Sequence, residues 1–227
     1  MFPDAAQILE SSFANVDIFL REPEWQSALQ STIIPTTDFT DRSEPVVTLW
    51  MTLACAPGLF KRVTEAVISQ RLQEKEAIVG GLRNLLVNLS KWSVRWESSL
   101  IGAADLEVDG PCSELVSSRE QCLTRYLAYL AFTNRFLVAI HPPAAAVAEK
   151  IAIVAATRII QLTETQAADP ISKLSTRVAF KIACSIQATA EQWSRATIMA
   201  RSRSLKASGT VDPDMFSSWC ALIGRTI

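Results

Sequence analysis

The segment from Glu114 to Ile140 constrains the fold more than any other part of the chain, because it is apolar on nearly every side of a helix. Its apolar residues recur every three or four positions, which is the spacing of an α-helix. One face carries Cys122, Tyr126, Tyr129, Thr133, Phe136 and Ile140, and the next carries Leu123, Leu127, Leu130, Asn134, Val138 and His141. Such a helix must be surrounded by other helices, so we expect it at the centre of the fold.

Helical spacing recurs along most of the chain, and no segment alternates clearly enough to be a strand. Hydrophobic residues make up 49% of the sequence but only seven residues are Gly, a shortage that disfavours a many-stranded sandwich or barrel. We therefore expect a single all-α domain over residues 1–227, a bundle of about eight helices around an apolar cavity, with 114–200 forming the central core helices. The helical segments are expected at about 4–19, 23–30, 45–56 and 59–71 (interrupted by Pro57-Gly58), 75–100, 114–140, 144–163, 170–200 and 213–223.

Proline, glycine and serine mark several of the expected helix ends. Ser43 is a suitable cap for the helix that has Pro45 in its first turn. Pro57-Gly58 is expected to break that helix, and the Gly80-Gly81 pair either bends the next long helix or marks its start.

The charge balance argues against nucleic acid as a direct partner. The sequence has 22 basic and 23 acidic residues, a net charge of −1, and lacks the excess of basic residues typical of a protein that binds nucleic-acid phosphates.

The first residues show no signal-peptide pattern. The apolar stretches at 126–140 and 144–156 are shorter than the roughly 20 residues that a helix needs to cross a bilayer. We expect no membrane partner and a cytoplasmic or nuclear location.

The five cysteines suggest neither a metal site nor a disulfide framework. They stand at long, unequal spacings without a CxxC pair. Most are expected to be small core residues. Because no dinucleotide, phosphate-loop or metal motif is present either, we expect no cofactor and no metal.

Few side chains could carry acid-base chemistry, since the sequence has one histidine and two tyrosines. The candidate polar groups are Tyr126, Tyr129, Asn134 and His141. His141 is either a helix-terminal residue bonded to a carbonyl or a group in a pocket. Arg135 needs a carboxylate if it is buried, or else it binds an anionic group of a ligand.

Wide aromatic side chains stand on the helices that we expect to be buried. The candidate ligand-binding walls are Trp50, Trp96, Phe136 and Trp193. Each of them can simply pack in the core, but several wide aromatic rings in one small helical body can also line a ligand cavity.

Several stretches together resemble the regulatory C-terminal half of fungal-specific transcription factors of the zinc binuclear cluster class. The stretches are FLREPEWQSAL, the Trp50 helix followed by APGLF, RYLAYLAFTNRFLVAIHP, IAIVAATRII and FSSWCALIGRTI. The resemblance implies a helical domain that senses a small ligand. The six-cysteine zinc cluster of that family has no counterpart here, so we expect no promoter recognition by this chain.

Two functions follow from these expectations. In the first, the chain binds a hydrophobic small molecule, such as a terpenoid, sterol or polyketide, as the resemblance implies. In the second, the same pocket serves a cofactor-independent cyclase or isomerase of fungal secondary metabolism, in which apolar walls fold the substrate for a pericyclic, Diels-Alder-like reaction. Both functions are compatible with a chain that forms a homodimer.

Overall fold

The computed structural model describes residues 22–36, 39–69, 74–101 and 112–165, together with 179, 180, 182, 183 and 186. Within these residues the fold is all-α, as predicted, and the only β-type pairing is an isolated bridge between Ile34 and Ser43. The elements are α2 (Pro23–Ser31), α3 (Glu44–Leu53), α4 (Ala56–Ser69), α5 (Lys75–Ile101), α6 (Cys112–Ile140), the 3₁₀ turn η2 (Pro142–Ala144) and α7 (Ala145–Thr165). The helices expected at 4–19 and 213–223, most of 170–200, and Trp193 lie outside the described residues.

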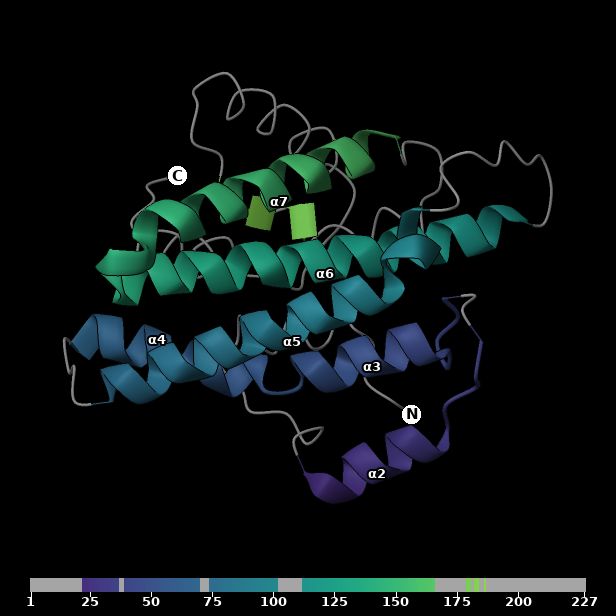
Figure 1. Cartoon of the computed structure of the whole chain (residues 1–227), viewed down its shortest axis with the longest axis horizontal. Coiled ribbons are helices and arrows are strands. Elements are labelled where there is room, and N and C mark those ends of the chain that lie inside the picture. The colour runs from purple at the N-terminus through teal and green to yellow at the C-terminus, as the bar shows by residue number, and fades with distance from the viewer. Residues whose placement is uncertain are drawn as a thin grey trace, which may run out of the picture.

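Helix α6 lies between its neighbours, as its apolar surface predicted. It packs against α7 on one side and α5 on the other, and it also touches α3 and α4. Figure 1 shows α7, α6 and α5 in succession, with α3 and α4 next to α5 and α2 outermost. All seven residues from 131 to 137 are buried, which requires cover around the whole helix circumference.

Helix α7 approaches α6 through small side chains. Ala148, Ala152 and Ala155 are buried one or two turns apart, and α7 has its main packing partner in α6. Alanine on the contact face lets two helix axes come close, because little side chain stands between them. The small side chains of this segment therefore suit its packing against α6.

The break between α3 and α4 was predicted at the wrong place. Helix α3 ends at Leu53 and α4 begins at Ala56, so Pro57 and Gly58 lie in the first turn of α4 rather than in the break. Proline is tolerated there because the first-turn N–H groups of a helix have no acceptor within the helix. The change of helix falls instead at Ala54 and Cys55, which form a turn.

The stretch Glu44–Ala66, which covers α3 and most of α4, is long and apolar enough to cross a membrane by length and composition. It was not among the apolar stretches considered from the sequence. Of the qualifying window, 67% is buried inside the fold, and buried core helices pass the same test as membrane spans.

Ser43 precedes α3 as predicted, but its side chain does not cap the helix. Its hydroxyl donates to the carbonyl of Thr40 at 2.7 Å, while its own carbonyl accepts the first helical bond from Val47. The side chain therefore closes the preceding turn instead.

The glycine pair does not mark the start of α5, which begins five residues earlier at Lys75 and includes both glycines. Gly81 serves close packing: a Cβ there would stand 2.9 Å from Cδ1 of Leu59 on α4, whereas one on Gly80 would meet nothing within 4 Å. The missing side chain lets α4 and α5 come together.

Candidate functional site

Four aromatic rings from α4 and α6 form a packed cluster in the core. Phe60 lies 4.6 Å from Phe136, 5.1 Å from Phe132 and 6.1 Å from Tyr129, measured between ring centroids. All four side chains are fully buried. Tyr129 and Phe136, predicted as site residues, are therefore brought together. Phe60, which was not among the predicted site residues, joins them.

A second aromatic contact joins α5 to α6, and a hydrogen bond from the same tryptophan joins α5 to α3. The rings of Trp92 and Tyr126 lie 5.3 Å apart, and the Trp92 indole N–H donates to the carbonyl of Pro45 at 2.8 Å. Tyr126, the other tyrosine predicted for the site, thus packs against a tryptophan whose polar atom is satisfied by the start of α3.

The indole groups of Trp50 and Trp96 differ from that of Trp92. Both side chains are buried, with 6% and 7% of their surface exposed. Their Nε1 atoms are buried and, within the described part of the chain, have no hydrogen-bond acceptor. A buried N–H without an acceptor costs about 1–3 kcal/mol, so two of them in one small domain need an explanation.

Arg119 on α6 also has buried N–H groups without an acceptor among the described residues, and here they belong to a charged side chain. Its Nε and Nη1 atoms are buried without a hydrogen-bond partner among the described residues, and its guanidinium lies 5.6 Å from the ring centre of Phe39. The sequence analysis missed both residues. In the sequence, the one sign that Phe39 is buried is its position as a phenylalanine within the otherwise largely polar loop between residues 31 and 44.

The side chains of the polar candidates Asn134 and His141 each have a hydrogen-bond partner within the fold. The Asn134 side-chain amide donates to the Leu130 carbonyl of its own helix at 2.7 Å. His141 Nε2 lies 3.1 Å from Arg83 Nη2, and because arginine only donates, Nε2 is the acceptor in this contact. The expected partner of His141, a carbonyl, is replaced by an arginine on α5.

Arg135 forms an ion pair with Glu149 of α7, which is the structural alternative predicted for a buried arginine. The Arg135 side chain is 6% exposed and that of Glu149 25%. The pair links the two most tightly associated helices of the described fold.

The four candidate catalytic residues do not converge on one point. Tyr126 and His141 are fifteen positions apart on one helix and its end, which corresponds to about 22 Å along the axis. Tyr129 lies in the aromatic cluster, Tyr126 near Trp92, and His141 next to Arg83.

Among the cysteines whose side chains the structure describes, Cys122 is buried and Cys55 is exposed. Burial raises the pKa of Cys122 to about 12, while nearby Arg125 acts in the opposite direction. Cys122 is thus a protonated core residue, as predicted. Cys55 is exposed because it stands in the turn between α3 and α4.

Among the described residues, no group of three His, Cys, Asp or Glu side chains could hold a metal ion. Comparisons of the chain with models of protein families, with curated proteins and with solved structures give no match.

Proposed function

We propose that this chain is a helical domain that binds a hydrophobic small molecule, a terpenoid, sterol or polyketide, and does not contact DNA. The observation that carries the proposal is the pair of buried indole N–H groups of Trp50 and Trp96, which lack acceptors in the described part of the chain. A ligand oxygen that accepts from either N–H would offset the cost of burying it.

The contrast with Trp92 supports this reading. Trp92 has the same side chain, is equally buried, and lies one helical turn from Trp96, yet its N–H is satisfied by Pro45. The fold can therefore supply an acceptor to a buried indole at this place. That it does so for one tryptophan and leaves two others without an acceptor favours a binding role for those two.

The ligand would be mostly apolar and would carry at least one oxygen acceptor. Tryptophan rings offer broad apolar walls with a single donor at the edge, which suits a hydrocarbon skeleton bearing a carbonyl or hydroxyl. The resemblance to regulatory domains of zinc binuclear cluster transcription factors supports a sensing role for such binding. The cyclase alternative would use the same molecule as its substrate, and its candidate donors are spread along α6.

Thermal denaturation with a panel of sterols, terpenoids and polyketides tests the proposal. A ligand at a hundredfold excess over its Kd should stabilise the fold by about 2.7 kcal/mol. The variants Trp50→Phe and Trp96→Phe keep an aromatic side chain, although a smaller one, and remove the donor, so they should bind the best ligand about two- to tenfold more weakly. Trp25→Phe is the control, because Trp25 is largely exposed. If no panel member stabilises the wild type, the proposal fails.

A further inference from the structure

Helices α5 and α6 run antiparallel, and two contacts fix their register. Arg83 meets His141 at one end, and further along α5 Trp92 meets Tyr126. Trp96 lies one turn beyond Trp92 on α5, and Arg119 lies two turns before Tyr126 on α6. Both therefore lie toward the same end of the helix pair, away from His141.

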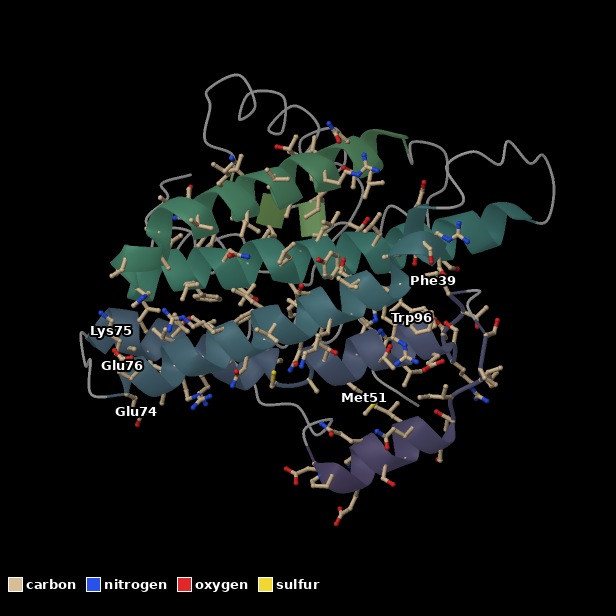
Figure 2. All side chains as sticks on the ribbon, viewed as in Figure 1. Phe39, Met51, Glu74, Lys75, Glu76 and Trp96 are labelled. Atoms are coloured by element: carbon tan, nitrogen blue, oxygen red, sulfur yellow. The ribbon has the colours of Figure 1, made fainter. Side chains whose placement is uncertain are left out.

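The loop before α3 reaches this same end. Phe39 lies under the Arg119 guanidinium, and Glu44 on α3 pairs with Arg95, the residue before Trp96. In the view of Figure 2, Phe39 and Trp96 are at one end of the fold, and Lys75, where α5 begins, is at the other. We refer to Phe39, Trp96 and Arg119 together as the donor end.

The donor end carries a positive charge on Arg119, and two of its nitrogen atoms have no acceptor among the described residues. The Arg119 guanidinium is a cationic group. Among the described residues that charge is met by the face of an aromatic ring rather than by a carboxylate. The Glu44 carboxylate accepts from Arg95, whose guanidinium lies over the Trp96 ring at 5.0 Å.

Phe39 is held in an unusual backbone conformation beneath Arg119. Its φ is 55°, in the left-handed region that residues other than glycine seldom occupy, and its side chain is buried. Hydrogen bonds on the C-terminal side fix the loop: Ile34 N–H donates to the Arg42 carbonyl and Ser43 N–H to that of Thr40. The fold thus accepts a strained residue that places an aromatic ring against the guanidinium.

We infer that the donor end binds the carboxylate of an apolar ligand, with Arg119 and the Trp96 indole N–H as donors to its oxygens. The inference rests on the proposed function and narrows its ligand to hydrophobic carboxylic acids. A carboxylate fits because, among the described residues of this end, the buried side-chain atoms without a partner are the nitrogen donors of Trp96 and Arg119, and because a single guanidinium balances a single negative charge.

Matched acids and esters test the inference, since an ester keeps the skeleton and loses the charge. The probes are abietic acid and oleic acid with their methyl esters, and their affinities are measured by the quenching of tryptophan fluorescence. Wild type should bind at least one acid roughly tenfold or more tightly than its ester, as expected for hydrogen bonds to a charged group. Arg119→Met should bring the affinities for acid and ester within about twofold of each other.

Three further variants separate a role in binding from a role in folding. Arg119→Lys keeps the charge and should retain part of the preference for the acid. Arg95→Gln removes a neighbouring but mostly exposed charge and should retain all of it. Trp96→Phe should weaken acid and ester alike, because the indole N–H can donate to either oxygen. Circular dichroism melts check that each variant is folded.

Each remaining outcome contradicts the inference in a distinguishable way. Equal binding of acid and ester by the wild type, or an unchanged preference in folded Arg119→Met, overturns the carboxylate site and leaves the proposed function standing. Binding of neutral panel ligands without binding of any acid would likewise overturn the carboxylate site and leave the proposed function standing. If neither the probes nor the panel bind, the proposed function fails as well.

Discussion

The indole nitrogen of Trp92 on α5 donates to the backbone carbonyl of Pro45 in the first turn of α3, at 2.8 Å and out of contact with solvent. This bond joins the start of α3 to α5. It also provides an internal reference for the two tryptophans whose N–H groups have no acceptor in the described part of the chain.

Trp92→Phe should destabilise the fold by about 1–3 kcal/mol, because it leaves the Pro45 carbonyl buried without its donor. Trp96→Phe removes an N–H that has no acceptor and should cost less than Trp92→Phe. Urea denaturation of both variants gives the comparison. Equal losses would mean that the Trp96 N–H has a partner in solution, and would weaken the proposed site.

Gly80→Ala and Gly81→Ala should have different effects although the residues are adjacent. Alanine at position 80 meets nothing within 4 Å and should stabilise α5 by about 0.5–1 kcal/mol. Alanine at position 81 would press on Leu59, which is buried, so the gain should be reduced or reversed. The denaturation midpoints of the two variants in urea give the comparison. Equal stabilisation by both substitutions would contradict the close packing of α4 on α5.

Glu149→Gln should destabilise the fold more than Glu44→Gln. The first substitution leaves Arg135 buried opposite a neutral side chain, and the second breaks a pair whose arginine is 60% exposed. We expect a loss of more than about 1 kcal/mol in the first case and less than about 1 kcal/mol in the second. Chemical denaturation at low and high salt measures both. A larger loss from Glu44→Gln would contradict the buried pair.

Cys55 and Cys122 should differ in reactivity toward iodoacetamide. The native chain at pH 8 should be alkylated at Cys55, while Cys122, buried and with its pKa raised to about 12, should react only after unfolding. Peptide mapping distinguishes the two sites. Rapid labelling of Cys122 in the folded chain would show that α6 is accessible to the reagent at that position.

The same pKa gives a direction for stability against pH. The Cys122 thiol has a pKa of 9.0 as a model group and about 12 in the fold. Between these values the unfolded chain has lost the proton and the native chain still holds it, so this contribution to stability falls as pH rises above about 9. Cys122→Ala should flatten the decline between pH 9 and 11, as measured by denaturation across that range.

The helices were predictable where the apolar spacing is local and strong. The segments expected at 23–30, 75–100, 114–140 and 144–163 correspond to α2, α5, α6 and α7, with ends shifted by a few residues. The break near Pro57 was misplaced because proline suits a helix start as well as a helix stop, and the sequence pattern does not separate the two.

The partners of the site residues were less predictable, because they come from distant parts of the chain. Arg83 meets His141 across 58 positions, and Pro45 meets Trp92 across 47. No local pattern distinguishes Trp92, whose N–H is satisfied, from Trp96 one turn later. Phe60 and Arg119 acquire their significance only when α4, α6 and the loop at Phe39 come together.

Native mass spectrometry of the purified chain, before and after incubation with an organic extract of the source organism, tests the central claim most directly. We expect a species heavier than the 24.9 kDa chain by the mass of one apolar compound, recovered unchanged on denaturation. A compound consumed and replaced by an isomer of equal mass would favour the cyclase instead. A chain that retains nothing from the extract would contradict the account.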